Sequence, residues 1–377
     1  MNTSLKAVKR IFTFGQLILI TFIAVSAINA QTSGVDLSFN AIPDKDLPSP
    51  PNFVVQADNK IIVFGNFQVA EGAIRDRIAR FNTDGSLDTS FNCSSCNSSI
   101  AGVVVQPDGK ILVSGSIGIS SNTYPLSVPI IYRLNSDGSR DSSFTSPFTT
   151  DLSQNVTGQS AIVNSVQPDG KILVTLFTAF TGGYISYDLY KLNINGTFDS
   201  SFTTFNVGGG RLSARIPSKI MSLPDGKILV AGNAHSNPAF LGRYNSDGSV
   251  DSTFERPTIS SSTSYSSISD FDVQSDGSLI VVGGFIAING VNRAGIAKLQ
   301  VAGNVDVSFP NLTIAGINRV KILSNGKILI ATSNRIYRLN ADGSTDNSFN
   351  SPTNITQIDN FKLDTAERII IYGTFTD

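Results

Sequence analysis

A short motif, Asp-x-Ser-Phe, recurs along this chain and constrains its fold more than any other feature. Between successive copies lies a tight-turn segment followed by an apolar run, as in Pro107-Asp108-Gly109-Lys110 before Ile111. A unit that recurs every ~40 to 60 residues predicts a propeller, a solenoid or a repeat array. The copies, one of which has Thr in place of Ser, begin at Asp36, Asp88, Asp141, Asp199, Asp251, Asp306 and Asp346.

Each unit reads as four short strands. In the second unit the expected strands lie at 101–106, 110–117, 130–135 and 139–144, and most of them are rich in Val, Ile and Leu and are bounded by Gly, Asn, Asp or Pro. No segment after residue 30 has a convincing helical period. Four strands in a meander of hairpins form one blade of a propeller. We therefore expect an all-β fold, a β-propeller of four-stranded antiparallel blades.

The turn motifs predict seven blade positions, with the last one incomplete. First turns occur near residues 58, 108, 169, 225, 276, 325 and 364, and the last unit stops at Asp377 after its second strand. The motif copy at Asp36 has no blade before it. The chain is therefore either a fragment that ends within a blade, or a ring in which an N-terminal strand docks directly on residues 369–375.

The first 30 residues have the pattern of a secretory signal peptide. Three basic residues between positions 6 and 10 precede a mostly apolar run at 11–25, and small residues follow at Ala27 and Ala30. The alternative is an uncleaved membrane anchor. We expect cleavage after Ala27 or Ala30, which leaves residues 31–377 as the propeller. The mature protein would then be secreted, periplasmic or at the cell surface, with no inserted segment.

The charge of the chain argues against two classes of partner. The net charge at pH 7 is −1, and removing the three basic residues of the leader brings it to about −4. A chain with this balance has no electrostatic basis for binding nucleic acid or anionic lipid. An unknown protein or glycan remains as the expected partner.

Cys93 and Cys96 are the only cysteines and follow directly after one motif copy. In an oxidising compartment this spacing predicts a local disulfide that closes a short polar loop. A free pair and a redox motif are the alternatives, but the redox motif would need a βαβ context. A structural zinc site would need four ligands, and the chain has a single histidine. We expect neither a metal nor a cofactor.

A basic residue stands eight positions before each Asp of the last six motif copies. If the intervening turn is a three-residue hairpin loop with a glycine bulge, the two residues lie opposite each other across a hairpin. Such pairs stabilise the fold and disfavour register slips, so we expect structural rather than catalytic roles. The pairs are Arg80–Asp88, Arg133–Asp141, Lys191–Asp199, Arg243–Asp251, Lys298–Asp306 and Arg338–Asp346.

These motifs, Pro-Asp-Gly-Lys-Ile-Leu-Val and Asn-x-Asp-Gly-Ser-x-Asp-x-Ser-Phe, resemble the delta-60 repeat, a bacterial β-propeller-type repeat of uncharacterised role. The resemblance spans nearly all of residues 36–377. Several turns depart from the pattern; Asp364-Thr365-Ala366, for example, lacks the glycine. The resemblance implies extracytoplasmic repeats and brings no catalytic residue with it.

Both repeat-encoded turns fall at one end of the expected propeller, and the variable loops fall at the other. Function usually lies on variable loops held by a rigid scaffold. The Asn-x-Asp-Gly turns lack the alternating ligand series of a calcium loop, and an Asx turn explains them. We therefore expect a binding site, with no catalytic residue, at the variable end; the candidate residues are Tyr184, Tyr187, Asp188, His235 and Arg335.

These features predict an exported, non-catalytic repeat scaffold or binding module. The alternative is a carbohydrate-active enzyme that uses carboxylates on the variable-loop face. Such an enzyme would need two of Glu71, Asp188 and Glu255 to converge, because glycoside hydrolysis uses a pair of carboxylates at a defined separation.

Overall fold

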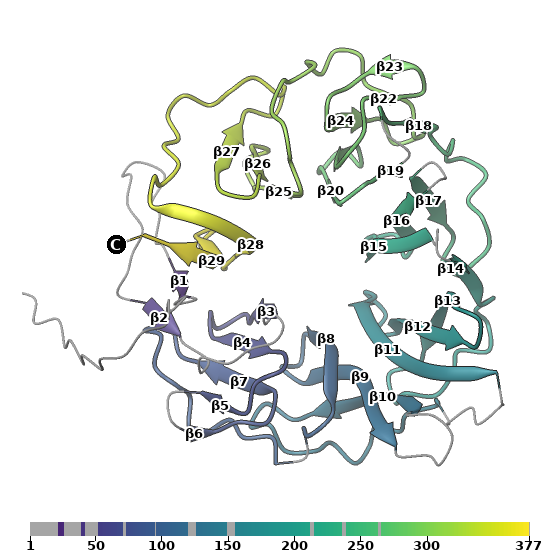
Figure 1. Cartoon of the computed structure of the whole chain (residues 1–377), viewed down its shortest axis with the longest axis vertical. Coiled ribbons are helices and arrows are strands. Elements are labelled where there is room, and N and C mark those ends of the chain that lie inside the picture. The colour runs from purple at the N-terminus through teal and green to yellow at the C-terminus, as the bar shows by residue number, and fades with distance from the viewer. Residues whose placement is uncertain are drawn as a thin grey trace, which may run out of the picture.

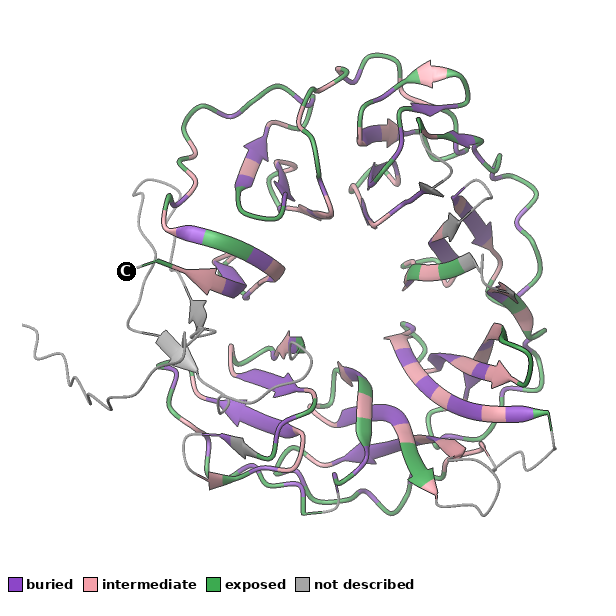
Figure 2. Ribbon diagram, in the orientation of Figure 1, coloured by how far each residue is buried: buried purple, intermediate pink, exposed green. Residues whose placement is uncertain are grey.

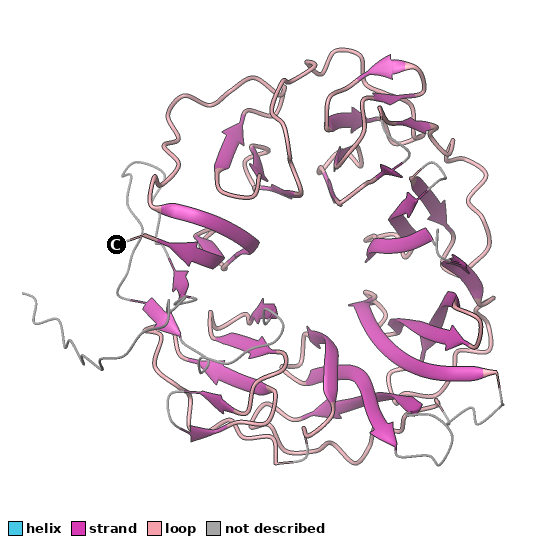
Figure 3. Cartoon of the chain, viewed as in Figure 1, coloured by secondary structure: helices cyan, strands magenta, loops and turns pink. Residues whose placement is uncertain are grey.

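We describe the protein from a computed structural model. It describes residues 22–25, 39–41, 52–70, 73–94, 96–119, 126–148, 155–211, 215–235, 239–262 and 265–376. These ranges contain strands, turns and bends but no helix (Figure 3). The strands form antiparallel sheets arranged in a ring around a central axis (Figure 1). The all-β expectation is confirmed.

Four of the sheets around the ring take three antiparallel strands each from one repeat. In each of them the first strand lies nearest the axis and the third lies farther out (Figure 1). The strands are β3 (Asn52–Val55), β4 (Ile61–Phe64) and β7 (Ile78–Phe81); β8 (Ser99–Val105), β9 (Ile111–Ile119) and β10 (Leu126–Leu134); β20 (Asp270–Val273), β21 (Leu279–Val282) and β24 (Ile296–Leu299); and β25 (Arg319–Ile322), β26 (Ile328–Ala331) and β27 (Ile336–Leu339).

Two neighbouring repeats share one eight-stranded sheet, because a connecting strand pairs on both sides. Residues Tyr184–Leu189 pair with β14, and Gly209 of β14 pairs with Arg215 of β15. The strands are β11 (Val156–Val166), β12 (Ile172–Phe180), β13 (Tyr184–Leu192), β14 (Phe205–Arg211), β15 (Arg215–Ser222), β16 (Ile228–His235) and β17 (Phe240–Tyr244), with β19 (Tyr265–Ser266) on β16.

The last sheet combines the two ends of the chain in the order β2–β1–β29–β28. β28 (Ile355–Leu363) and β29 (Ile369–Phe375) belong to the last repeat, and β2 (Phe39–Ala41) contains the end of the first motif copy. Between them lies β1 (Phe22–Val25), within the segment that the sequence predicts to be a signal peptide.

The last repeat also contacts the first repeat directly, which closes the ring without β1. Ile370 and Tyr372 pack in one hydrophobic cluster with Phe53. Asn360 Nδ2 donates to Asn52 Oδ1 at 3.0 Å, and Thr365 N donates to Asn59 Oδ1 at 3.0 Å.

Short strands outside these sheets carry the outer loops. They are β5 (Val69–Ala70) with β6 (Ala73–Ile74), and β18 (Ile259–Ser260) with β22 (Ala287–Ile288) and β23 (Val291–Asn292).

The hydrophobic core lies between neighbouring sheets rather than at one centre (Figure 2). Burying one large apolar side chain contributes about 1.5–3 kcal/mol, so each of these clusters stabilises the contact between two repeats. The Phe of the Asp-x-Ser/Thr-Phe motif belongs to such a cluster in five repeats. These residues are Phe91, Phe144, Phe202, Phe254 and Phe309.

The first turn of each repeat follows the expected loop geometry. In the second repeat Gln106 N donates to Lys110 O at 2.8 Å, Gly109 N donates to Gln106 O at 2.9 Å, and Gly109 has a φ of 81°. A positive φ at this position favours glycine, because an L side chain would be strained there.

The expected fourth strand is reduced to one isolated bridge in each of six repeats, such as Leu134 with Arg140. The chain turns directly afterwards, because Asp141 Oδ1 accepts from Ser143 N at 3.0 Å and Asp141 O accepts from Phe144 N at 3.3 Å. The motif that the sequence suggested as a strand therefore mainly builds a turn.

Candidate functional site

The predicted basic–Asp pairs lie together at the turn end of their repeats. In the second repeat Asp141 N donates to Arg133 O at 3.0 Å, so the two residues lie opposite each other across the hairpin. The arginine pairs have Nε–Oδ2 distances of 2.8 Å (Arg80–Asp88), 2.7 Å (Arg133–Asp141), 2.6 Å (Arg243–Asp251) and 2.6 Å (Arg338–Asp346); the lysine pairs have Nζ–Oδ2 distances of 3.6 Å (Lys191–Asp199) and 3.7 Å (Lys298–Asp306).

A second cation, which sequence reasoning missed, joins five of these pairs. Lys110 of the first turn places its Nζ 2.8 Å from Asp141 Oδ2, on the same oxygen that Arg133 contacts. We call this group of first-turn lysine, third-strand cation and motif Asp the ion-pair cluster of its repeat. The lysines are Lys60 with Asp88, Lys110 with Asp141, Lys171 with Asp199, Lys227 with Asp251 and Lys327 with Asp346.

The third-strand cation also bonds to the following repeat. Arg133 Nη1 donates to Ile194 O at 2.6 Å, and Ile194 lies in the second turn of the next repeat. Thr145 N donates to Asn195 O of the same turn at 3.0 Å. The ion-pair cluster therefore holds two repeats together as well as one hairpin. The same bond runs from Arg80 to Ser136, from Lys191 to Ser246 and from Arg243 to Val301.

These contacts keep the motif carboxylates ionised. Hydrogen bonds from Lys110 and Ser143 hold the pKa of Asp141 far below its ordinary value of 3.8. Lys327 and Ser348 do the same for the pKa of Asp346. Because both oxygens of each carboxylate already accept hydrogen bonds, we assign these residues structural roles.

The two cysteines form a disulfide, with 2.04 Å between their sulfur atoms. Both are buried, and Tyr132 Oη lies 3.1 Å from Cys96 Sγ. Burial in this hydrophobic cluster makes the disulfide part of the packing between the first two repeats.

Three candidate binding residues lie on a strand rather than in a loop. The sequence predicts variable-loop positions for these residues, but β12 continues to Phe180 and β13 begins at Tyr184. Gly182 and Gly183, with φ values of 81° and 80°, form a tight turn between these strands. Tyr187 packs against Phe177 with ring centroids 5.2 Å apart, and Asp188 accepts from Ser186 Oγ and Asn206 Nδ2. Tyr184 is exposed at the start of the strand.

The other two candidates lie elsewhere. His235 is the last residue of β16 and pairs with Tyr265, so its backbone belongs to a strand and not to the expected loop. Arg335 is exposed in the turn before β27, where its guanidinium lies 5.0 Å from the ring centre of Tyr337. β13 and β16 share the eight-stranded sheet, whereas Arg335 lies beside a separate sheet. The five candidates therefore come from three repeats.

The two described carboxylates of the enzyme alternative, Asp188 and Glu255, lie in different parts of the fold. Glu255 N donates to Ala302 O at 2.7 Å, which places this residue against a second turn and not among the variable loops. Asp188 lies within β13, and Glu71 lies outside the described residues. Within the described ranges no group of three or more His, Cys, Asp or Glu side chains is arranged to hold a metal ion.

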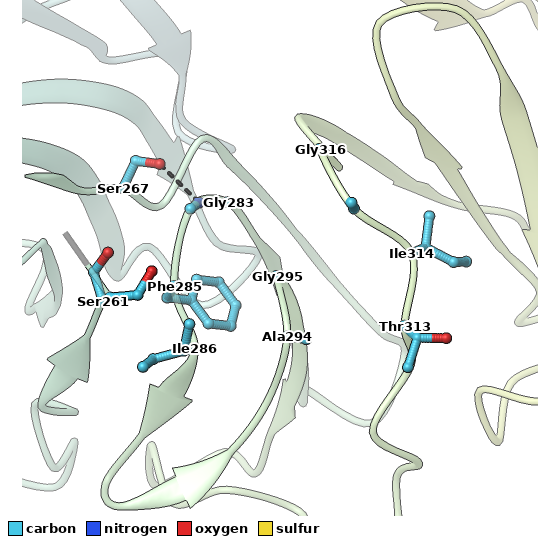
Figure 4. Close-up of a pocket in the computed structure, with 13 residues that line it drawn as sticks. Ser261, Ser267, Gly283, Phe285, Ile286, Ala294, Gly295, Thr313, Ile314 and Gly316 are labelled. Carbon is cyan, nitrogen blue, oxygen red and sulfur yellow. Dashed lines mark hydrogen bonds between the residues drawn. The ribbon is translucent and has the colours of Figure 1, made fainter.

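A pocket of about 670 Å³ lies between the repeats 274–309 and 323–349 (Figure 4). The segment from Gly283 to Ile286 forms one wall and the connector from Thr313 to Gly316 forms the other. A Cβ at Gly283 would lie 2.1 Å from Ser267 O, so only glycine allows this wall to approach the segment of Ser267 so closely. Gly284 N donates to Ser267 Oγ at 2.8 Å, which fixes the wall.

The lining of this pocket is neutral. Phe285 and Ile314 supply apolar surface, and Ser261, Ser267 and Thr313 supply hydroxyl groups. None of the described lining residues carries a titratable side chain. Such a surface can bind a ligand through hydroxyl groups, backbone groups and apolar contact, but it offers no general acid, general base or nucleophile of the carboxylate, imidazole or thiol type.

No helix among the residues that the structure describes is long and apolar enough to cross a membrane.

Comparison with solved structures finds similar chains at low sequence identity. The extracellular domain of a hybrid two-component system from B. thetaiotaomicron is similar over 94% of this chain and 39% of its own, with 13% identity and a TM-score of 0.47. The Pan2 WD40 domain of Neurospora crassa is similar over 87% of this chain and 91% of its own, with 13% identity and a TM-score of 0.48. A gluconolactonase from Xanthomonas campestris is similar over 97% of both chains, with 11% identity and a TM-score of 0.38.

A search of curated proteins finds no match. A family model gives a definite result, because it matches six repeats that together make up more than half of the chain. The matched residues are 56–91, 106–144, 167–202, 223–254, 274–309 and 323–349. The chain belongs to the β-propeller family described as a domain of unknown function, DUF5122.

Proposed function

We propose that this protein is an exported, non-catalytic binding scaffold, a seven-bladed propeller of the delta-60 repeat type. The observation that carries the binding role is the neutral pocket between the repeats 274–309 and 323–349. Its volume of about 670 Å³ lies within the range of small-molecule sites, ~300–1,000 Å³. Its hydroxyl groups and apolar walls suit a neutral glycan segment or an uncharged protein segment.

The hydrophobic clusters support the count of seven blades. Seven clusters among the described residues each combine side chains from neighbouring repeats, including the cluster between the last repeat and the first. Seven such contacts fit a closed ring of seven units. Cleavage after Ala27 or Ala30 would remove β1, the strand that pairs with β29, while the packing of Ile370 and Tyr372 against Phe53 would still join the last repeat to the first.

Glycan-array binding, combined with a hydrolysis assay on each hit, tests the binding role. Ala315→Trp places a large ring in the pocket, so binding should be lost. The matched control is Ala341→Trp at an exposed second-turn position where other repeats carry Ile194 and Val301. The proposal is supported if a glycan binds without being hydrolysed, and if this binding is lost in Ala315→Trp but retained in Ala341→Trp. Turnover of any bound glycan would contradict the non-catalytic role.

Sequencing the N-terminus of the protein recovered outside the cytoplasm tests export. We expect the mature chain to begin at residue 28 or 31, after Ala27 or Ala30. A chain that starts at Met1 and remains in the cytoplasm would contradict export. It would not bear on ligand binding in the neutral pocket.

A further inference from the structure

The strands nearest the axis differ in charge around the ring, although they occupy equivalent positions. One such position lies two residues before the residue that opens the first turn; in the second repeat it is Val104, because Gln106 opens the turn. Charged side chains occupy it in three consecutive repeats at the C-terminal side of the ring. In chain order the residues are Val54, Val104, Ser165, Met221, Asp272, Lys321 and Lys362.

Asp270, two residues before Asp272 on β20, is a further carboxylate on these inner strands, and both of its oxygens accept hydrogen bonds. Its Oδ1 accepts from Lys219 Nζ at 2.7 Å and from Phe271 N at 2.8 Å. Its Oδ2 accepts from Val320 N of the neighbouring strand β25 at 3.0 Å. Asp270 therefore neutralises Lys219 and connects β15, β20 and β25.

The second carboxylate, Asp272, is engaged in the same way. Its Oδ2 accepts from Ile322 N at 2.9 Å and lies 3.0 Å from Lys321 Nζ. Together the two carboxylates balance Lys219 and Lys321, two of the four cations among the described side chains of these inner strands, which leaves Arg319 and Lys362.

Neither of the two remaining cations forms an ion pair within the described chain. Arg319 donates to two backbone carbonyls, Asn318 O at 2.9 Å and Asp359 O at 3.4 Å. Lys362 Nζ lies 6.0 Å from the ring centre of Phe53 and has no carboxylate partner among the described residues. Asp359 on β28 is the third described carboxylate of this wall, and its Oδ1 accepts from Gln357 Nε2. The described side chains of β15, β20, β25 and β28 thus carry a surplus of one positive charge, and neither Arg319 nor Lys362 is paired with a carboxylate.

Burial, followed by the charges of Lys219, Lys321 and Arg319, lowers the pKa of Lys362 to about 8, while Asp270 opposes the shift. The ammonium is therefore a poorly solvated cation beside other cations. A bound anion would relieve both effects, because it would replace lost hydration and offset the like charges.

A cavity of about 550 Å³ lies at the ends of β8, β11 and β15, and the last of these strands also carries Lys219. Gln167, Ser165 and Ser222 line this cavity. Gln167 Oε1 and the hydroxyl oxygens of both serines are buried and have no hydrogen-bond partner among the residues that the structure describes. β15 and β28 lie on opposite sides of the ring axis (Figure 1). The inner strands therefore combine a cationic wall with a neutral wall that has unused polar groups.

We propose that the inner strands bind a small acidic ligand, with its oxyanion group at Lys362 and Arg319 and its hydroxyl-bearing part in the cavity lined by Ser165, Gln167 and Ser222. This site is separate from the neutral pocket between the repeats 274–309 and 323–349. The oxyanion is a carboxylate or a phosphate, and both groups accept charge-assisted hydrogen bonds from lysine and arginine.

Isothermal titration calorimetry at pH 7 with three probes tests the proposal. Glucuronate supplies a carboxylate, glucose 6-phosphate supplies a phosphate, and glucose is the neutral control. Binding of one or both acids but not of glucose supports the site, and the acid that binds identifies the oxyanion. Equal binding of glucose, or no binding of either acid at millimolar concentration, would overturn it.

Variants of Lys362 localise the site. Lys362→Met should weaken binding of the acid at least about tenfold, because a hydrogen bond to a charged group is lost. Lys362→Arg should keep most of the affinity. Arg256→Gln, which removes an exposed cation stacked on Tyr244, should change it less than twofold. Equal affinity of Lys362→Met and the unaltered protein would contradict the assignment, provided that thermal melting shows both to be folded.

The pH dependence gives a second readout. Lys362 faces Lys219, Arg319, Lys321 and Asp270, and it loses its proton as the pH rises through about 8. Affinity for the acid should therefore fall between pH 7 and pH 9.5 in the unaltered protein, and it should stay nearly constant in Lys362→Arg. Parallel pH profiles of the two proteins would contradict the role of Lys362.

Discussion

The repeats 223–254 and 274–309 follow one another along the chain, yet their ion-pair clusters differ. In the first, Lys227 and Arg243 both contact Asp251 Oδ2, at 2.8 and 2.6 Å. In the second, Ser278 takes the place of the first-turn lysine, and Lys298 lies 3.7 Å from Asp306.

The contact between the third-strand cation and the following repeat is also weaker in the repeat 274–309. Arg243 Nη1 donates to Val301 O at 2.6 Å, whereas no hydrogen bond from Lys298 to the next second turn occurs among the described residues. At that contact the carboxylates of Asp270 and Asp272 bond to the backbone of β25 near the axis instead. The neutral pocket also lies there. The repeat 274–309, whose ion pair at the turn end is weaker, is therefore joined to the next repeat by hydrogen bonds near the axis. The neutral pocket occupies part of the space between these two repeats.

The largest expected effect on this comparison comes from acid. The pKa values of Asp88, Asp141, Asp199, Asp251 and Asp346 lie far below the ordinary 3.8 in the folded protein. In the unfolded chain these groups bind protons near the ordinary value, so their stabilising contribution is complete above about pH 4 and is lost as the pH falls toward the folded values. Denaturation midpoints should therefore fall steeply between about pH 4 and pH 2.

Equal denaturation midpoints at pH 7 and pH 3 would show that the ion-pair clusters contribute little to stability. A midpoint that already falls between pH 7 and pH 5 would show that other titrating groups control the acid sensitivity.

A substitution of the motif Asp should have the next largest effect and should separate the two kinds of repeat. Asp141→Ala leaves Lys110 and Arg133 close together without a carboxylate, and we expect a loss of about 3–5 kcal/mol in the free energy of unfolding. Asp306→Ala, at a pair in which both side chains are 19% exposed, should cost less than about 1 kcal/mol. Chemical denaturation measures both. Similar losses in the two variants would remove the distinction drawn above.

The smallest effect concerns repair of the weaker cluster. Ser278 N donates to Asp276 Oδ1, as Lys110 N donates to Asp108 Oδ1, so the backbone at 278 already has the conformation that the lysine uses. Ser278→Lys should bring a second cation to Asp306 and raise the free energy of unfolding by about 0.5–1 kcal/mol. In the double variant Ser278→Lys with Asp306→Ala this gain should disappear. A gain that persists without Asp306 would arise from another contact.

Local sequence was sufficient for the hairpins. The turn Asn135-Ser136-Asp137-Gly138-Ser139 carries the Asx residue and the glycine that the loop requires, and Asn135 N donates to Ser139 O at 2.9 Å. Once this loop closes, Arg133 and Asp141 must lie opposite each other. The sequence also contains a sign of the Lys110 contact, because a lysine ends most of the first turns. The contact itself was not predicted, because its partner Asp141 lies 31 residues away along the chain.

The candidate sites were less predictable, because side-chain types did not mark them. The pair Gly182-Gly183 was the signal that residues 178–188 form a hairpin, and its positive φ values show why. The neutral pocket depends on the close approach of Gly283 to Ser267 and on a connector from another repeat. Backbone proximity of this kind follows from the packing of the ring and leaves no charged or aromatic pattern in the sequence.

In the four repeats where the third-strand cation bonds to the following second turn, this bond makes a repeat complementary to a copy of itself. The donor, Arg133, and the acceptor carbonyl, Ser136 O, belong to the same repeat: Ser136 O receives Arg80 from the preceding repeat, and Arg133 reaches the next one. A unit with this head-to-tail complementarity can be duplicated within a gene, and each new copy arrives with both halves of its joint. Growth by duplication is then limited by closure of the ring, and the repeats can diverge on their loops while the joints keep the same chemistry.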